Sequence, residues 1–236
     1  KYHFLKLAQI PFHEGRLERD FERLCAFLLE ADRSHFLYRD FQSRNIMVRD
    51  GEPWLIDYQG GRRGALQYDV ASLLYDAKAA IPFGVRQQML EQYLDALQEL
   101  IPVNRELFRH QFRGFAVVRI LQAMGAYGYR GWFQRKEHFL SSIPFALANI
   151  TQLFGDGLPV ELPEVAAALA AAAVRCEALN DARNEARTAA DKPPQSPHPS
   201  PSLPTDRESL FAGLTVHITS FSYKRGGYPA DSTGHG

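Results

Sequence analysis

The chain has 236 residues, enough for one or two domains, and its 27 Lys+Arg balance its 27 Asp+Glu. Zero net charge gives no general argument for nucleic acid, a membrane surface or an acidic substrate as partner, although a local basic patch stays possible. No apolar run approaches the length of a membrane span, and residues 1–11 do not have the pattern expected of a signal peptide. Cys25 and Cys176 lie far apart and form no metal motif, which indicates free thiols and a cytoplasmic location.

Apolar spacing predicts helices at the start of the chain. Residues 1 to about 9 favour a helix that ends near Pro11, and residues 14–31 favour an amphipathic helix packed on a core. The apolar face of that second helix comprises Leu17, Phe21, Leu24, Phe27 and Leu28. The charged face opposite is predicted to hold Arg16, Glu18, Arg19, Asp20 and Glu22.

Residues 45–57 predict a β-hairpin after a short extended segment at 35–38. Two apolar runs, 46–48 and 54–56, flank Asp50-Gly51, a strong two-residue turn signal because both positions tolerate positive φ. In this register Arg49 faces Glu52 and Asn45 faces Ile56. Asn45 and Asp57 therefore come to the same end of the hairpin.

Together with this hairpin, the rest of the sequence predicts a mainly α protein with one small β-hairpin. Residues 58–68 are expected to form a glycine-rich loop, after which Asp69 caps a helix that Pro82 ends. Further helices are expected at residues 85–100, 105–127, 137–154 and 163 to about 187. The second of these is expected to be central.

Composition changes abruptly near Asp191. Residues 1–187 are expected to form one domain, and the Pro/Ser-rich stretch 188–212 a disordered linker. Residues 214–223 alternate apolar and polar side chains like a strand. One strand cannot stand alone, so residues 213–236 are either a disordered tail or, as we favour, the truncated start of an α/β domain.

The stretch Tyr38 to Asp57, YRDFQSRNIMVRDGEPWLID, has the spacing of a phosphoryl-transfer site. Asn45 follows Asp40 by five residues and Asp57 follows Asn45 by twelve, with the hairpin between them. Asp40 would align an acceptor hydroxyl as the catalytic base. Asn45 and Asp57 would supply the hard oxygen ligands that Mg²⁺ prefers beside the phosphates of ATP.

Each of these residues also has a structural interpretation. A lone Asp in a loop is more often a turn former or a cap, and the Asp-to-Asn interval alone is weak. Arg39 is a candidate substrate ligand, with pairing to a carboxylate the favoured alternative, and Arg44 is open between the same two roles. Asp69 is expected to brace the loop while it caps its helix.

The motifs LYRDFQSRNIMV, WLIDYQGG and GALQYDVASLLYDA resemble the aminoglycoside phosphotransferase/choline kinase-like family over residues 1–155. Within it the chain is most similar to bacterial anomeric kinases of the amino sugars N-acetylmuramate and N-acetylglucosamine. The resemblance implies the large C-terminal lobe of a protein-kinase-like fold, with Asp40 catalytic and Asn45 and Asp57 binding metal. Tyr38 replaces the family's usual residue at a position expected mainly to pack.

The glycine-rich loop and strand lysine that such kinases place on ATP are not found before Asp40. We therefore expect the nucleotide-binding lobe upstream of Lys1, and expect this chain alone to be inactive. Residues 214–231 also resemble the opening of the C-terminal domain of RapZ-type RNase adapter proteins. That resemblance implies RNA binding or sensing of an amino-sugar metabolite.

Two hypotheses follow. The chain is part of an ATP- and Mg²⁺-dependent kinase of a small-molecule hydroxyl, or a regulatory, pseudokinase-like module joined to an RNA-binding or metabolite-sensing domain. The intact Asp40, Asn45 and Asp57 favour the enzyme. Acceptor-binding candidates, for which core packing is the safer interpretation, are Arg119, Gln122, Tyr127 and Tyr129.

Overall fold

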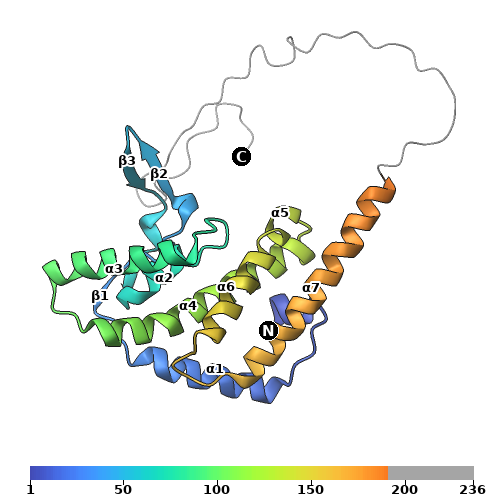
Figure 1. Ribbon diagram of the computed structural model, residues 1–236, viewed down its shortest axis with the longest axis horizontal. Coiled ribbons are helices and arrows are strands. Elements are labelled where there is room, and N and C mark those ends of the chain that lie inside the picture. The colour runs from blue at the N-terminus through green and yellow to red at the C-terminus, as the bar shows by residue number, and fades with distance from the viewer. Residues whose placement is uncertain (191–236) are drawn as a thin grey trace, which may run out of the picture. The chain divides into compact units, whose positions relative to one another are not determined.

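The computed structural model describes residues 1–190, which form a helical assembly around the long helix α4 (Arg105–Gly128) (Figure 1). Helices α1, α2 and α6 and the N-terminal segment all pack against α4, as its apolar sequence predicted. Its core-facing side chains are Phe108, Phe112, Phe115, Val117, Ile120 and Met124. No helix in this part of the chain is long and apolar enough to cross a membrane.

The helices and strands occur in the predicted order. The α-helices are α1 (Glu14–Leu29), α2 (Leu66–Leu74), α3 (Phe83–Leu100), α4, α5 (Glu137–Leu140), α6 (Ile143–Gly155) and α7 (Pro163–Ala190). The strands are β1 (His35–Leu37), β2 (Ile46–Arg49), β3 (Glu52–Leu55) and β4 (Arg62–Gly64). This mainly α composition with a small hairpin agrees with the fold class predicted from sequence.

Three predicted boundaries are wrong. The first helix is only the π-helical segment Tyr2–Lys6, and the chain turns at Gln9, where φ is +57°. The helix predicted at 137–154 is split into α5 and α6 because Pro144 lacks the N–H that a helix interior needs but fits a first turn. Helix α7 continues to Ala190, beyond the predicted helix end near residue 187.

Asp20 does not lie on the exposed face of α1. It is 1% exposed, and its carboxylate accepts a hydrogen bond from the backbone N–H of Val165 at 2.9 Å and another from Arg23. The amide of Val165 is one of the free donors in the first turn of α7. Asp20 therefore ties α1 to the start of α7, a contact that periodicity could not reveal.

The strands form two separate antiparallel pairs. Strand β2 pairs with β3, and β1 pairs with β4, with His35 opposite Gly64. Residues 58–68 were predicted to be a loop throughout, yet they contain a 3-10 turn (Tyr58–Gly60), β4 and the start of α2. The remaining linker and the predicted domain at 213–236 lie outside the described residues.

Candidate active site

The hairpin has the predicted turn and register. Asp50 and Gly51 both have positive φ, +54° and +84°, and Arg49 pairs with Glu52. The backbone N–H of Ile56 donates to the carbonyl of Asn45 at 3.0 Å, one residue beyond the strand ladder. This bond places Asn45 beside the residue that precedes Asp57.

Asn45 is joined to Asp40 by a hydrogen bond across the loop. Its side-chain Nδ2 donates to the backbone carbonyl of Asp40 at 2.9 Å, and the residue is 6% exposed. Among residues 1–190 no hydrogen bond uses its Oδ1, which leaves that oxygen available as a metal ligand. The interval between Asp40 and Asn45 thus corresponds to one closed loop.

The carboxylates of Asp40 and Asp57 have few protein partners. Asp40 is half-buried and accepts only a long bond, 3.2 Å, from Gln42 Nε2 in the described chain, while the exposed Asp57 accepts from Gln59. The backbone of Asp57 is left-handed, with φ of +65°. Such a conformation costs a non-glycine residue about 1 kcal/mol and is common at functional sites.

Tyr38 connects the loop to the end of the hairpin. It is 7% exposed, and its hydroxyl donates to the carbonyl of Ile56, directly before Asp57. The pKa of Tyr38 is raised by burial and then by the negative charges of Asp57, Asp40 and Asp69. The three carboxylates therefore act on one phenol, and Tyr38 does more than the packing that its sequence position suggested.

Asp69 holds the backbone just before Asp40. Its two carboxylate oxygens accept from the N–H groups of Tyr38 at 2.6 Å and Arg39 at 2.8 Å. Burial raises the pKa of Asp69, and those two N–H donors and the Arg119 charge partly oppose the rise. Asp69 does not cap α2, because that helix begins at Leu66 and Asp69 lies inside its first turns.

A second carboxylate brace, at Asp76, was not found from sequence. Asp76 Oδ2 accepts from both the backbone N–H (3.0 Å) and the hydroxyl (2.6 Å) of Ser43. Ser43 starts the 3-10 turn that ends at Asn45. No sequence pattern links residues 43 and 76, so only the folded chain reveals this contact.

Arg39 and Arg44 lack the carboxylate partners considered for them. Neither forms an ion pair within residues 1–190. Arg39 has a left-handed backbone, φ +79°, and its guanidinium covers Gly60, where an added Cβ would lie 3.0 Å from Arg39 Nη2. The pairing favoured for Arg39 is therefore wrong for the described residues, and Arg44 stays exposed.

Two of the acceptor-binding candidates lie against α2. Arg119 donates to Tyr68 Oη (2.8 Å), Ser72 Oγ (2.8 Å) and Gln122 Oε1 (2.9 Å), and its charge partly opposes the rise that burial causes in the pKa of Asp69. The other two candidates, Tyr127 and Tyr129, pack on aromatic neighbours, and Tyr127 also packs against the core, as the safer interpretation held for it.

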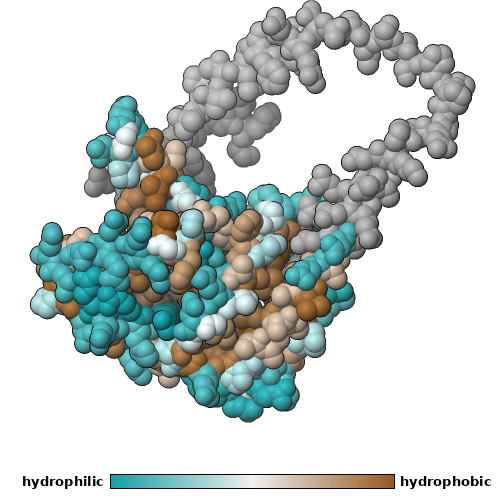
Figure 2. Space-filling view, in the orientation of Figure 1, coloured by the Kyte–Doolittle hydropathy of each residue, from teal (hydrophilic) through white to brown (hydrophobic). Residues whose placement is uncertain are grey.

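Both faces of the hairpin carry exposed apolar side chains. The side chains of Val48 and Trp54 are 74% and 59% exposed, and Phe36 on β1, in the other strand pair, is 69% exposed. Figure 2 shows hydrophobic surface on this hairpin, above α2. Contiguous exposed apolar surface is one of the features by which binding surfaces are recognised.

The donor set suits magnesium. Asn45 and Asp57 offer an amide and a carboxylate oxygen, and Mg²⁺ is usually held by one or two carboxylates together with waters and phosphate oxygens. Residues 1–190 contain no cluster of three or more His, Cys, Asp or Glu side chains that would form a dense metal cage. A two-ligand site that leaves room for phosphates fits the residues present.

The braced loop and the hairpin connect Asp40, Asn45 and Ile56, the residue before Asp57, on a mainly helical domain. In comparison with known proteins, residues 3–107 match the phosphotransferase enzyme family. The chain is 28% identical over 141 residues to an N-acetylmuramate/N-acetylglucosamine kinase of Pseudomonas putida, with 58% of this chain and 42% of the relative covered.

Two further relatives carry the same name. The protein of Pseudomonas aeruginosa is 31% identical over 72 residues, which are 29% of this chain and 21% of the relative. That of Neisseria meningitidis is 26% identical over 112 residues, 46% and 34% of the two chains. The chain thus spans less than half the length of these relatives. The family match ends at residue 107 and gives no support to the resemblance to RNase adapter proteins predicted for residues 214–231.

Proposed function

We propose that the protein is an ATP- and Mg²⁺-dependent kinase that phosphorylates a hydroxyl of a small molecule. The observation that carries the proposal is the loop and hairpin that connect Asp40, Asn45 and Asp57 through backbone and side-chain bonds. These are a carboxylate that can accept a proton and two oxygen ligands, as phosphoryl transfer requires.

Each residue has one task in this proposal. Asp40, whose carboxylate has only a long protein bond, orients the acceptor hydroxyl and takes its proton. Asn45 Oδ1 and the Asp57 carboxylate hold the metal, which when bound neutralises charge on the phosphates. Asp69 and Asp76 fix the backbone at the two ends of the loop.

The acceptor class follows from the relatives. All three are named for N-acetylmuramate and N-acetylglucosamine, so we propose an amino sugar, with the anomeric hydroxyl as the position to test first. The regulatory alternative gains no support from these names. The exposed apolar face of the hairpin flanks the site, and we expect the nucleotide or a further part of the parent protein to cover it.

The test uses the full-length protein. ATP consumption with Mg²⁺ is measured against amino sugars, amino alcohols and aminoglycosides, and repeated with Asp40→Asn. We expect turnover with an amino sugar and a loss of at least about 100-fold in Asp40→Asn, the scale of general-base catalysis. Asp50→Asn is the matched control, because the exposed Asp50 can be replaced within an Asn-Gly turn. A flat panel, or equal loss in both variants, would refute the proposal.

A further inference from the structure

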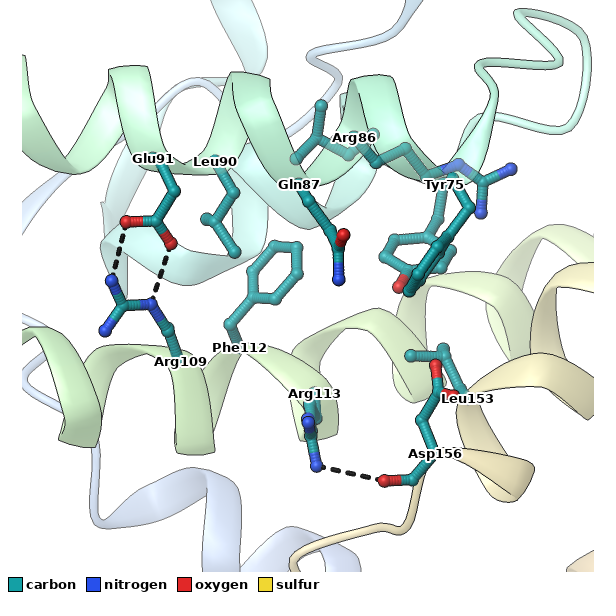
Figure 3. A pocket seen from close by; sticks show the side chains of 12 residues that line it. Tyr75, Arg86, Gln87, Leu90, Glu91, Arg109, Phe112, Arg113, Leu153 and Asp156 are labelled. Atoms are coloured by element: carbon teal, nitrogen blue, oxygen red, sulfur yellow. Dashed lines mark hydrogen bonds and ion pairs between the residues drawn. The ribbon is translucent and has the colours of Figure 1, made fainter.

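A cleft with a volume of about 360 Å³ opens between α3 and α4, bounded by the ends of α2 and α6 (Figure 3). Its floor is apolar and includes the buried Leu74, Phe112 and Leu153. The size falls at the lower end of small-molecule pockets. None of Asp40, Asn45 and Asp57 lines the cleft, so it is distinct from the site described above.

Arg86 lies at one end of this cleft and is only 8% exposed. Its Nε donates to the carbonyl of Ile81 and its Nη2 to Oδ1 of Asn149, both at 2.7 Å. Its Nη1 is buried and has no acceptor in hydrogen-bonding geometry among residues 1–190. The guanidinium also lies over the Tyr75 ring, 4.8 Å from the centroid.

All of these neighbours are neutral, although an arginine side chain keeps its charge in a protein. No carboxylate of residues 1–190 forms an ion pair with Arg86. A buried charge without a counter-charge is strongly unfavourable. Burial accordingly lowers the pKa of Arg86. An anion from solution would supply the missing partner.

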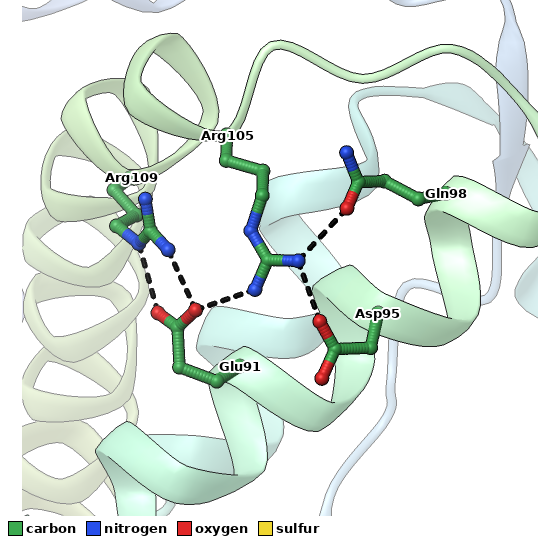
Figure 4. Close-up of polar contacts among 5 residues, drawn as sticks. All are labelled: Glu91, Asp95, Gln98, Arg105 and Arg109. Atoms are coloured by element: carbon green, nitrogen blue, oxygen red, sulfur yellow. Dashed lines mark hydrogen bonds and ion pairs between the residues drawn. The ribbon is translucent and has the colours of Figure 1, made fainter.

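The other charges of the cleft leave it positive. Glu91 is already occupied by Arg105 and Arg109, which bind its two oxygens at 2.6–2.8 Å (Figure 4). Arg113 donates only to backbone carbonyls, those of Asp156 at 3.2 Å and of Gly157 at 3.1 Å. The Asp156 carboxylate is the one acid of the cleft that forms no ion pair within residues 1–190.

We propose that this cleft binds a small organic anion, with the negative group towards Arg86, Arg113 adding positive charge at the rim, and the apolar body against Phe83, Leu90 and Phe112. Guanidinium groups bind carboxylate and phosphate through charge-assisted bonds, and the apolar walls select an aromatic or branched body over an inorganic ion.

The test measures binding to the full chain by calorimetry and therefore does not depend on kinase activity. The probes are phenylacetate and phenyl phosphate, which separate the two anion chemistries, and phenylacetamide as a neutral match for the first. We expect at least one anion to bind and phenylacetamide to bind at least tenfold more weakly.

Variants locate the site. Arg86→Met keeps an unbranched apolar stem and removes the guanidinium charge, and Arg113→Gln changes an exposed residue at the rim. We expect each to weaken anion binding at least several-fold. Arg175→Gln is the control, since Arg175 also donates to neutral oxygens but lies on α7, outside the cleft.

The proposal would be overturned if neither anion bound at 10 mM, about a hundred times the dissociation constant of roughly 0.1 mM expected of a small two-contact ligand. It would also be overturned if the amide bound as tightly as the anions, or if Arg113→Gln left anion binding unchanged. The rim variant keeps the test decisive even if Arg86→Met fails to fold.

Discussion

Replacing Asp69 with alanine removes the brace in front of Asp40 without touching the proposed catalytic groups. The backbone N–H groups of Tyr38 and Arg39 lose acceptors at 2.6 and 2.8 Å. A buried donor left unpaired costs about 1–3 kcal/mol. Because both bonds are only partly buried, we take the lower half of that range for each. The expected loss is about 2–4 kcal/mol in the free energy of unfolding.

Urea-induced unfolding of the chain, followed by circular dichroism, measures this loss. The matched control is Asp95→Ala, which removes a carboxylate that is 68% exposed and paired with Arg105. It is expected to cost below about 1 kcal/mol. A loss below about 0.5 kcal/mol in Asp69→Ala, or equal losses in both variants, would show that Asp69 is not a brace.

Two further predictions concern helix packing and pH. Gly128→Ala should lower the melting temperature, because the added Cβ would lie 2.1 Å from the carbonyl oxygen of His3. At Gly125 an added Cβ meets nothing within 4 Å, so Gly125→Ala should raise the melting temperature slightly. The opposite order of the two melting temperatures would contradict the packing described. Arg109 and Arg105 lower the pKa of Glu91 to about 2. The stability that the Glu91 carboxylate provides is therefore complete above the ordinary Glu pKa of 4.5 and is lost as pH falls towards 2. Because Glu91 is 43% exposed, Glu91→Gln should cost at most about 1 kcal/mol in the free energy of unfolding at pH 7. In urea unfolding at a series of pH values, the variant should lose less stability between pH 4.5 and 2 than the original protein. An equal loss in both proteins would count against the ion pair.

The hairpin and the position of Asn45 beside its end could be predicted because the information is local. Asp50-Gly51 specifies the turn, the turn specifies the register, and the register brings Asn45 beside Ile56. The main helices could be predicted equally well, because their apolar periodicity indicates which face is buried.

The tertiary polar contacts could not be predicted. Asp20 lies on α1 and Asp76 lies just after α2, and acidic residues are mostly exposed, yet each accepts bonds from a segment more than 30 residues away. Asp69 was expected both to brace the loop and to cap its helix, and its non-local donors, the N–H groups of Tyr38 and Arg39, leave no trace in spacing. Tyr38 was assigned to packing for the same reason, although its hydroxyl reaches the end of the hairpin.

The central claim is that Asp40 and Asp57 belong to one metal-dependent site, and a double-mutant cycle on the full-length protein tests it most directly. The rate constant for phosphate transfer to an amino sugar is measured for Asp40→Asn, Asp57→Asn and the double variant, with melting temperatures confirming that all three fold. When residues act as a unit, the effects of their mutations on the rate are strongly non-additive. We predict that each single change costs at least about 100-fold and that the double variant is within about tenfold of the slower single one. Losses that multiply, or a single variant at full rate, would contradict the account.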